Sequence, residues 1–492
     1  MNSTLTATKP PVAPIVLAPA NATTRVGQLD WARTVLLAAS AVAAFHLAYA
    51  ASAASFLTLI YLFCLFELSV IATSRRAFYV GLTIGVAVCA PRMDFLWTIF
   101  KMAAIPLWLV IALWHGLFLV LARQVRLRCR PVLVLLLVPL LWLGLEYFRS
   151  EIYFLKFSWF NAGYAFAGNL PSAPLGFLGV YGIGWFLMTI AVGVAQLPRK
   201  QALASGFAAL LALGIIANRA LVFPASPVPT NSKGPVVAGI QLEFPIDSEL
   251  PGYLDQVLRK HPTADIVVLS EYTLDGPPPE TLKNWCRQHA KHLVVGGKDP
   301  LPNNQFYNTA FVVGPTGEII FKQVKNVPIQ FFADGLPAPV RTLWNSPWGR
   351  IGLAVCYDLN YRRVIDDFIR LGAHALIIPT MDVTDWGENQ HRLHARVAPI
   401  RSAEFRVPIF RLCSSGISQL TDREGRVLAT AGFPGQEEII GGILPIGNAG
   451  RLPLDTLLAP LATLVTLLLA VWSAIQAWKS RAIALPASSR SH

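Results

Sequence analysis

Three residues with complementary chemistry each follow a short apolar run in the second half of the chain. Glu271 follows the run ADIVVLS, Lys325 follows EIIFKQV, and Cys356 follows the run from Arg350 to Val355. A thiol can attack a carbonyl carbon, a nearby carboxylate can accept the thiol proton, and a fixed ammonium can stabilise the oxyanion that forms. Together the three residues predict acyl chemistry through a covalent cysteine intermediate.

Each of the three residues also has an ordinary structural explanation. A lone cysteine beside a strand is usually a small core residue, a glutamate that leaves an apolar run is commonly ion-paired, and a lysine can protect the edge of a sheet. The catalytic interpretation therefore requires that the three side chains meet in the fold.

Residues 232–447 must position these side chains, and their sequence alternates strand-like runs with helical ones. Runs such as VVAGIQLE, HLVVGG, TAFVVG and ALIIPT are short and apolar, and helical stretches such as LDQVLRKH and VIDDFIRLGA lie between such runs. This alternation predicts an α/β layered domain with a buried sheet, whose strand ends present the functional residues.

The remainder of the chain is too apolar for a soluble protein. Of the 492 residues, 54% are hydrophobic and only 14% are charged, whereas soluble domains contain roughly 25% charged residues. A bilayer core requires about 20 apolar residues per helix. Eight windows predict a seven-helix membrane domain over residues 31–222 and one further helix over residues 454–478: Trp31 to Ala50, Ser55 to Thr73, Phe78 to Trp97, Ile99 to Ala122, Pro131 to Phe148, Leu175 to Leu197, Ala202 to Val222, and Leu454 to Trp478.

The basic residues indicate how these helices are oriented. The net charge of +13 comes from 41 Lys and Arg against 28 Asp and Glu, and the basic residues gather in alternate loops. Basic loops mark the cytoplasmic side of a membrane, so the charge needs no nucleic-acid partner. We expect a multi-pass membrane protein, with cytoplasmic tails at residues 1–30 (disordered) and 479–492 and an α/β domain outside the cytoplasm. The cytoplasmic loops contain Arg75 and Arg76, then Arg123, Arg126, Arg128 and Arg130, then Arg199 and Lys200.

The loop from Glu151 to Pro174 reads EIYFLKFSWFNAGYAFAGNLPSAP and is rich in aromatic residues and glycine. It is expected on the same side of the membrane as the α/β domain. Aromatic side chains at this depth are typical of an interfacial belt, but they would also suit an entrance through which a lipid approaches the site. The sequence leaves both explanations open.

The contexts of the three reactive residues resemble the motifs of the nitrilase, or carbon-nitrogen hydrolase, superfamily. VVLSEYTLDG is similar to its glutamate motif, GEIIFKQVK to its lysine motif and GLAVCYDLNY to its cysteine motif, in the same order. The spacing from Gly317 matches the family lysine to Lys325 and not to Lys322. The resemblance implies a nitrilase-like αββα sandwich in which Glu271, Lys325 and Cys356 are catalytic.

The predicted helices around this domain resemble the architecture of the apolipoprotein N-acyltransferase family. FSWFNAGYAFAG and PLGFLGVYGIGWFLM are similar to a loop and helix of that family, and QHRLHARVAPIRSAEFRVPIFRLCSSGIS is similar to a later segment. This resemblance implies that an acyl chain moves from the sn-1 ester of a phospholipid to Cys356 as a thioester. The N-terminal amine of a diacylglyceryl-cysteine apolipoprotein then accepts it. The resemblance also implies a location in the bacterial inner membrane, with the α/β domain in the periplasm. It implies no metal and no organic cofactor, and we expect a monomer.

The same resemblance suggests which neighbours support the reaction. Tyr357 and Asp358 would lie at or behind the oxyanion site, and the candidates for substrate binding are Asp334, Trp386 and Trp159.

The chain also departs from the family pattern. Ser270 stands where a proline usually precedes the catalytic glutamate, and Asp358 stands where a glutamate usually follows Cys-Tyr. A second glutamate is missing from NVPIQFFADG, where Asp334 is the nearby carboxylate, and LEFPIDSELPGY lacks an expected tryptophan. These departures leave open a membrane-tethered amidase that uses water as the acyl acceptor. A transporter explains the sequence less well, because few ionisable residues lie within the helices: His46, Glu67, His115 and Glu146. An inactive scaffold would make the presence of all three reactive residues a coincidence.

Cysteines and histidines outside the motifs give two further expectations. Cys286 and Cys413 could form a disulfide outside the cytoplasm, whereas Cys356 must remain free. Three histidines lack a ligand spacing and are expected to be structural or surface residues: His374, His391 and His394.

The loop from Phe331 to Pro339 has the composition of a mobile apolar lid. Phe331 and Phe332 would cover an apolar site, and Gly335 would supply a hinge.

Overall fold

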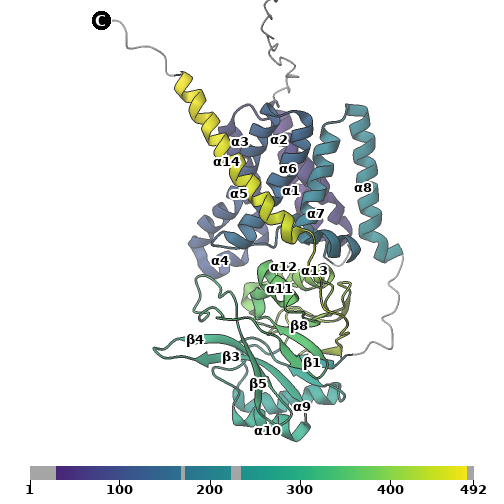
Figure 1. The fold of residues 1–492 in the computed structure, drawn as a ribbon, viewed down its shortest axis with the longest axis vertical. Coiled ribbons are helices and arrows are strands. Elements are labelled where there is room, and N and C mark those ends of the chain that lie inside the picture. Colours follow the sequence, from purple (N-terminus) through teal and green to yellow (C-terminus); the bar gives the residue numbers. More distant parts are fainter. Residues whose placement is uncertain (1–28, 168–171, 223–233, 485–492) are drawn as a thin grey trace, which may run out of the picture.

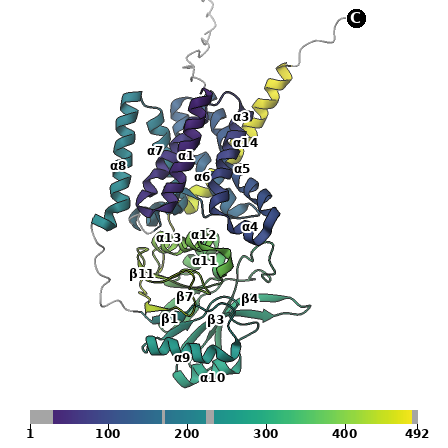
Figure 2. The same cartoon turned by 180° about the vertical axis from the view of Figure 1, so that it is seen from behind.

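The computed structural model describes residues 29–167, 172–222 and 234–484. The expected N-terminal tail lies almost entirely outside the described residues, as do residues 485–492 of the expected C-terminal tail. The described chain forms a helical bundle stacked on an α/β domain (Figure 1), and the reverse view gives the same arrangement (Figure 2).

The helical bundle contains the apolar windows predicted from the sequence. Within the described residues, six helical stretches are long and apolar enough to cross a membrane, so the protein is a membrane protein: Trp31–Ala50, Phe95–Arg128, Pro131–Ile152, Ala173–Ala195, Arg199–Ile216 and Asp455–Lys479. The helices of the bundle are α1 (Trp31–Ala50), α2 (Thr58–Leu68), α3 (Ser74–Cys89), α4 (Phe95–Phe100), α5 (Ala104–Arg128), α6 (Pro131–Tyr147), α7 (Ser172–Ala195), α8 (Arg199–Val222) and α14 (Asp455–Ala484).

Two of the eight predicted windows fold as shorter helices. The window Ser55 to Thr73 contains α2, which has 11 residues after a 3₁₀ turn. The window Phe78 to Trp97 is interrupted where α3 ends at Cys89 and a 3₁₀ turn begins at Ala90, because Pro91 cannot donate a helical hydrogen bond. The number of eight crossings therefore stays a prediction.

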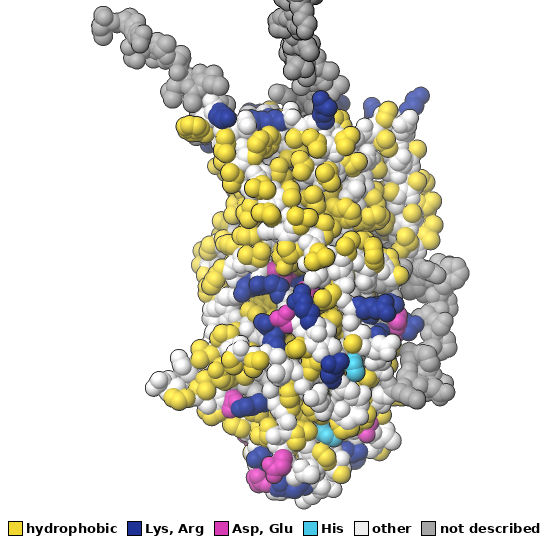
Figure 3. Space-filling view, viewed as in Figure 1, with side chains coloured by type: hydrophobic (Ala, Val, Ile, Leu, Met, Phe, Trp, Pro, Cys, Tyr) yellow, Lys and Arg dark blue, Asp and Glu magenta, His cyan; other side chains and the backbone are white. Residues whose placement is uncertain are grey.

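The surface of the bundle is a continuous apolar belt (Figure 3). Lys and Arg side chains gather at the rim of the bundle furthest from the α/β domain, and a second group lies just beyond the belt on the domain side. This distribution is typical of a protein whose belt contacts lipid tails and whose rims contact headgroups.

The α/β domain consists of two stacked six-stranded sheets. The first has the strand order β12-β1-β2-β3-β4-β5 and the second β11-β10-β9-β8-β7-β6. Each sheet has a parallel centre, formed by β1, β2 and β3 in one and by β7, β8 and β9 in the other, with antiparallel strands at its edges. The strands are β1 (Val236–Ile240), β2 (Ile266–Val268), β3 (His292–Pro300), β4 (Phe306–Val313), β5 (Ile319–Val324), β6 (Trp344–Ser346), β7 (Gly349–Leu353), β8 (Ala375–Thr380), β9 (Ile409–Cys413), β10 (Ser418–Thr421), β11 (Val427–Ala431) and β12 (Ile439–Ile443).

Helices cover the outer face of each sheet, which gives the four αββα layers that the family resemblance implied. Buried Val, Ile and Leu side chains of both sheets form the core between them. The helices α9 (Leu250–Lys260) and α10 (Glu280–His289) cover the first sheet through a separate apolar cluster. The second sheet is covered by α11 (Arg362–Arg370) and α13 (Val397–Phe405), with α12 (Glu388–Ala395) just before α13.

The bundle and the domain share one hydrophobic core. The apolar cluster beneath α11 and α13 is continuous with the core of the membrane helices. A buried ionic latch lies in this junction: the Arg362 guanidinium pairs with Asp366 at 2.9 Å, with Glu404 of α13 at 3.1 Å, and with Asp455 at the start of α14. The backbone of α7 is interrupted here at Gly179 (φ 77°). Only glycine fits at this position, because a Cβ atom would overlap the Asp455 carboxylate. The domain is therefore docked on the bundle and not tethered loosely to it.

This fold bears on two questions that the sequence left open. Cys286 in α10 and Cys413 in β9 are both free thiols, so the disulfide that the sequence allowed is not formed. In the described part of the aromatic loop after Glu151, Trp159, Phe160 and Tyr164 are buried, whereas Phe154 is exposed, so only part of the loop could contribute to an interfacial belt.

Candidate functional site

Four polar side chains lie just beyond the carboxyl ends of strands in the two sheets. Glu271 follows β2, Lys325 directly follows β5, Cys356 follows β7 and Asp382 follows β8. Gly296 of β3 allows the backbone at Glu271 to approach, because a Cβ atom would lie only 2.5 Å from the Glu271 Cα. All four side chains are almost completely buried.

Lys325 lies at the centre of a buried polar cluster. Its ammonium donates to the Glu271 carboxylate at 2.8 Å and pairs with the Asp334 carboxylate at 2.7 Å. The Asn308 amide nitrogen donates to both carboxylates, at 2.7 and 2.9 Å, and the Tyr272 hydroxyl donates to Asp334 at 2.8 Å. Burial disfavours the lysine charge, but the neighbouring acidic groups, Glu271 first, raise the pKa of Lys325 well above its usual value. The ammonium is therefore permanently charged and held in one place.

Cys356 occupies a strained turn beside this cluster. The residue has φ 52°, a left-handed conformation that a non-glycine residue rarely adopts except at functional sites. Its thiol donates to the Met381 carbonyl at 3.6 Å, and the Met381 amide donates to Glu271 at 2.9 Å. Burial and the Glu271 charge raise the pKa of the Cys356 thiol well above its usual value, although Lys325 acts in the opposite direction. The resting thiol is therefore protonated and requires a base.

Asp358 joins the cysteine turn to the segment that contains Lys325. Its carboxylate is fully buried and accepts from the main-chain amides of Asn326 at 2.8 Å and Val327 at 2.9 Å. It also accepts from the Val355 amide at 3.2 Å, just before the nucleophile turn. Burial, partly offset by these hydrogen bonds, raises the pKa of Asp358 to about 6. The side chain is thus a positioning group behind the reactive residues.

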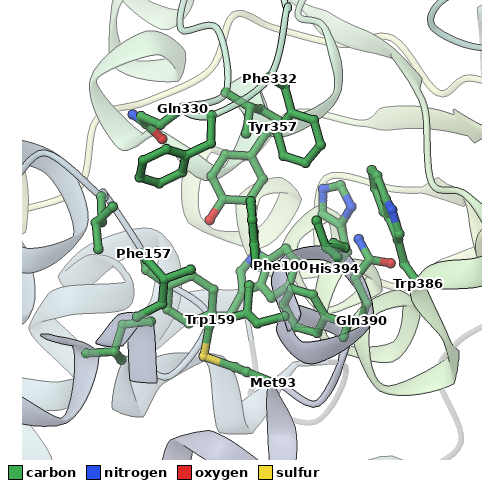
Figure 4. A pocket seen from close by; sticks show the side chains of 18 of the residues that line it. Met93, Phe100, Phe157, Trp159, Gln330, Phe332, Tyr357, Trp386, Gln390 and His394 are labelled. Atoms are coloured by element: carbon green, nitrogen blue, oxygen red, sulfur yellow. The ribbon is translucent and has the colours of Figure 1, made fainter. Parts of the chain in front are cut away.

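Cys356 opens into a cavity of about 150 Å³ between the bundle and the domain. In Figure 4, Met93, Phe100, Phe157 and Trp159 of the bundle face Gln330, Phe332, Tyr357 and His394 of the domain. The wall is almost entirely apolar, with Cys356, Asp382, Gln390 and His394 among its few polar members. The whole lining consists of Met93, Phe95, Leu96, Ile99, Phe100, Leu107, Ile111, Leu155, Phe157, Trp159, Ile329, Gln330, Phe331, Phe332, Cys356, Tyr357, Asp382, Trp386, Gln390 and His394.

A chain of hydrogen bonds fixes the position of Trp159 in this wall. The Trp159 indole donates to the Asn360 side-chain oxygen, and the Asn360 amide nitrogen contacts His394 Nε2 at 3.3 Å. His394 Nδ1 lies 2.9 Å from Asp382, which is also paired with Arg411. The Trp159 ring stacks on the His394 ring with centroids 5.3 Å apart. A loop of the bundle is thereby held to the reactive end of the domain.

The protonation of this chain follows from its charges. Burial disfavours ionisation of Asp382, but the His394 ring and the Arg411 guanidinium hold the pKa of that carboxyl well below its usual range. Burial and the Arg411 charge lower the pKa of His394 to about 4. At neutral pH the ring is uncharged, donates from Nδ1 to Asp382 and accepts at Nε2 from Asn360.

Several of these residues were not found from the sequence. Asp382 follows the apolar run ALIIPT just as Glu271 follows its own run, so the same reasoning could have found it. His394 was expected to be merely structural or at the surface, but it lines the cavity. Asn308 and Asn360 carry no sequence signal of their own.

The structure distributes the remaining sequence candidates among different positions. Trp159 and Trp386, the candidates for substrate binding, line the cavity, and so does Tyr357, the candidate for the oxyanion site. Asp334 does not line it, because its carboxylate faces Lys325. Lys322 is partly exposed and pairs with Asp299, which leaves Lys325 as the lysine of the cluster.

The segment from Phe331 to Pro339 contains two different parts. Phe331 and Phe332 are exposed and contact the Phe100 ring of the bundle, each at 5.9 Å between centroids. Gly335 (φ 79°) packs against the backbone of β4, and the Leu336 amide donates to the Phe306 carbonyl at 3.0 Å. Gly335 thus holds this segment against β4. The predictions that it acts as a hinge and that the two phenylalanines form a lid remain predictions.

Comparison with known proteins matches the two halves of the chain separately. Residues 12–193 match the apolipoprotein N-acyltransferase N-terminal domain, and residues 247–447 match the carbon-nitrogen hydrolase domain. The order of these domains agrees with the helical bundle followed by the sandwich. The chain belongs to the apolipoprotein N-acyltransferase family.

Curated members of the apolipoprotein N-acyltransferase family match across both halves. The protein of that name from Geobacter metallireducens is 24% identical over 372 residues, which cover 65% of this chain and 70% of the relative. The one from Shewanella oneidensis is 24% identical over 362 residues, which cover 63% and 68%. Among solved structures, Saccharomyces cerevisiae Nit3, a member of branch 10 of the nitrilase superfamily, is 22% identical and has a TM-score of 0.38. That match covers 45% of this chain and 93% of Nit3.

The departures from the apolipoprotein N-acyltransferase pattern occupy supporting positions around the reactive groups. Asp334 pairs with Lys325 in the region where the missing second glutamate was expected, and Asp358 fills the position after Cys-Tyr with four hydrogen bonds to its carboxylate. Within the described residues, no group of three or more His, Cys, Asp or Glu side chains is arranged to hold a metal ion.

Proposed function

We propose that this protein transfers an acyl chain from a phospholipid to the N-terminal amine of a diacylglyceryl-cysteine apolipoprotein, through a thioester on Cys356. The named relatives carry the first part of this proposal, because they are apolipoprotein N-acyltransferases. The observation that carries the chemistry is the position of the thiol, which meets a buried base-and-cation cluster on one side and an apolar cavity at the membrane on the other.

In the first half-reaction Glu271 accepts the proton of the Cys356 thiol, and the thiolate attacks the ester carbonyl carbon of the phospholipid. The oxyanion is stabilised by the Lys325 ammonium and by the main-chain amide of Tyr357. The ester C–O bond then breaks, and the proton passes from Glu271 to the leaving lysophospholipid oxygen. The product is an acyl thioester on Cys356.

In the second half-reaction the acceptor amine attacks the thioester carbonyl carbon and gives its proton to Glu271. The C–S bond breaks as the amide forms, and the proton returns to the cysteine sulfur. Asp334 acts through Lys325, because its carboxylate holds the ammonium in place from behind. Asp358 acts through the backbone of residues 326 and 327, which fixes the lysine segment against the cysteine turn.

The composition of the cavity favours an acyl chain over a small polar amide. Its wall combines aromatic and aliphatic side chains from α4, α5 and the Phe157–Trp159 loop with those of the domain. Burial of such a chain gains about 0.8 kcal/mol per CH₂ group. A polar amide substrate would find few partners there. This argument favours the acyltransferase over the tethered amidase, although both would use the same cysteine.

We also propose the membrane arrangement inferred from the loop charges. Residues 31–222 and 454–478 would form the membrane domain with eight crossings, and residues 232–447 would form the periplasmic catalytic domain. The Lys and Arg side chains at the rim furthest from the domain support a cytoplasmic position for that rim (Figure 3).

The proposal is tested by intact-mass analysis of the full-length protein after incubation with a phospholipid. We expect a mass increase equal to one acyl group in the native chain and none in Cys356→Ser. Cys413→Ser is the matched control, because Cys413 is a buried free thiol of the same domain that does not line the cavity. An adduct that persists in Cys356→Ser, or its absence from the native chain, would contradict the proposal.

A further inference from the structure

A second cavity lies at the junction, apart from the Cys356 cavity, and its lining is polar. It measures about 230 Å³ and is lined by Arg406, Arg423, Glu424, Asn448 and Arg451. None of these residues lines the Cys356 cavity. Three guanidinium groups therefore converge on a hollow that the proposed reaction does not use.

The charges around this hollow are unbalanced. Glu424 is the one carboxylate in the lining, and it forms an ion pair with Arg426 at 3.5 Å. Among the described residues, no carboxylate lies within ion-pair distance of Arg423 or Arg451, and Arg423 Nε donates to the Arg406 carbonyl at 2.8 Å. Burial lowers the pKa of Arg423, and although Glu424 opposes this effect, the Arg406 and Arg451 charges add to it. An anion in the hollow would relieve this repulsion.

The hollow lies where two apolar spans leave the membrane. The Arg406 side chain packs against Gly176 near the start of α7, since its Cδ lies 3.1 Å from the position of a Cβ there. The Arg451 amide donates to the Phe405 carbonyl at 2.9 Å, four residues before α14 begins. Both spans start at this level, so the arginines lie at the depth of lipid headgroups. Figure 3 shows basic side chains gathered in this band just below the apolar belt.

Exposed apolar side chains continue from the hollow onto the membrane side. Phe177 of α7 is 66% exposed and Leu457 of α14 is 77% exposed. The Leu454 amide donates to the Phe177 carbonyl at 2.8 Å, so the two spans are adjacent there. A basic hollow that borders an apolar strip has the two parts needed to hold one phospholipid molecule.

We propose that Arg406, Arg423 and Arg451 bind the phosphodiester group of an anionic phospholipid, whose acyl chains lie along Phe177, Leu454 and Leu457. Guanidinium groups bind phosphate oxygens in a bidentate manner, which suits them to this ligand. A lipid without a positive headgroup is preferred, because the lining already carries an excess of positive charge. The bound lipid fixes the domain-proximal ends of α7 and α14 at the membrane surface, at a site separate from the acyl donor.

The test measures lipid binding by the full-length protein in detergent micelles, with native mass spectrometry as the readout. Phosphatidylglycerol, phosphatidylcholine and inorganic phosphate are compared for the native chain, Arg451→Gln and the double variant Arg423→Gln/Arg451→Gln. The matched control is Arg259→Gln, an exposed arginine of α9 on the face of the domain away from the bundle (Figure 1). Arg406 is left intact because its side chain packs against α7.

The proposal predicts that the native chain and Arg259→Gln bind phosphatidylglycerol at least about tenfold more tightly than phosphatidylcholine. The double variant loses this preference, and Arg451→Gln, which removes an exposed side chain and leaves the fold intact, loses part of it. Formation of the Cys356 adduct is retained in these variants, so failure here is distinguishable from failure of the proposed function. Equal phosphatidylglycerol binding by the native and variant chains would overturn the proposal. Displacement of the lipid by inorganic phosphate would also overturn the proposal and would identify the hollow as a site for soluble anions.

Discussion

Lys325 and Arg362 are both buried cations surrounded by carboxylates, but their partners come from different parts of the molecule. The partners of Lys325, Glu271 and Asp334, belong to the sandwich, and Glu271 accepts from the Met381 amide while the Met381 carbonyl accepts from the Cys356 thiol. Those of Arg362 come from α11, α13 and the start of α14, where the domain meets the bundle. The first cluster lies next to the reactive thiol, whereas the second joins the domain to the start of α14.

This difference predicts that the Lys325 cluster serves the reaction and the Arg362 cluster serves the assembly, and substitutions in each cluster test this. Loss of a charge in the first cluster should remove the reaction and leave the assembly intact. Loss of a charge in the latch should weaken the assembly and leave the reactive groups intact. The cavity wall lies between the two, because it is built from both the domain and the bundle.

The largest effect is expected for Glu271→Gln. The substitution removes the base that accepts the cysteine proton, so we expect acyl-adduct formation to slow by about 10³-fold. The glutamine keeps an oxygen for Lys325 and Asn308 but cannot also accept from the Met381 amide, so the thermal midpoint should fall less than in the latch variant described below. The rate of adduct formation from intact-mass time courses checks the first point, and thermal unfolding checks the second.

Glu280→Gln is the control, since Glu280 is an exposed residue of α10 outside the cavity lining. A slow Glu271→Gln variant that also unfolds at a much lower temperature would show that the cluster is structural and not only reactive.

The next largest effect is expected for Arg362→Met. The substitution leaves three buried carboxylates without their shared cation, which costs about 3–5 kcal/mol for a buried pair. We expect a lower thermal midpoint in detergent, with adduct formation retained below that temperature. Arg370→Met should have a much smaller effect, because the Arg370 side chain is 52% exposed where it pairs with Asp367. An unchanged midpoint for Arg362→Met would remove the basis for the latch.

A smaller, pH-dependent effect is expected for His394→Phe. The ring of native His394 takes up a proton near pH 6.5 when unfolded but only at about 4 when folded. Between these values the unfolded chain binds more protons, so the native protein loses up to about 3 kcal/mol of stability as the pH falls from 6.5 to 4. Phenylalanine retains the stack on Trp159 and removes this dependence.

Thermal midpoints of the two proteins across that pH range provide the measurement for His394. Parallel curves would show that His394 does not titrate as inferred. Asp382 affects a different range: its depressed pKa stabilises the fold above its unfolded value of about 3.9 and ceases to do so as the carboxyl is protonated at lower pH.

The smallest effect is expected for Phe332→Ala in the cavity wall. The side chain is 47% exposed and contacts Phe100 of the bundle. Partial loss of its apolar contact should raise the KM for a long-chain phospholipid up to about tenfold and leave kcat unchanged. A short-chain donor, which does not reach this ring, should show no difference. An equal effect on both donors would argue that Phe332 shapes the reactive turn and not the acyl site.

The sequence was most informative where a local pattern decides the structure. The strand-like runs predicted an α/β layered domain, and the resemblance of the Glu271, Lys325 and Cys356 motifs to the nitrilase superfamily implied the sandwich. The apolar windows located the helices, although the window from Phe78 to Trp97 was read through Pro91, which ends a helix. In such cases the local propensity and the final structure agree.

The sequence was least informative where distant segments meet. Trp159 and Asn360 are hydrogen-bonded although they lie 201 residues apart, and no local pattern encodes that contact. Whether Cys286 pairs with Cys413 stayed open in the sequence for the same reason, because spacing along the chain says nothing about separation in space. The shared core of bundle and domain likewise follows from tertiary packing, which a single sequence does not display.

The central claim is that Cys356 passes an acyl chain from a lipid to an amine, and one transfer experiment tests it most directly. The full-length protein is first acylated with a phospholipid whose acyl chain is labelled, and then mixed with a diacylglyceryl peptide that has a free N-terminal amine. A parallel sample receives the same peptide with its amine acetylated. The account predicts that only the free amine discharges the label from Cys356, as an N-acyl peptide. Release of free labelled fatty acid at the same rate with both peptides would contradict it and identify water as the acceptor.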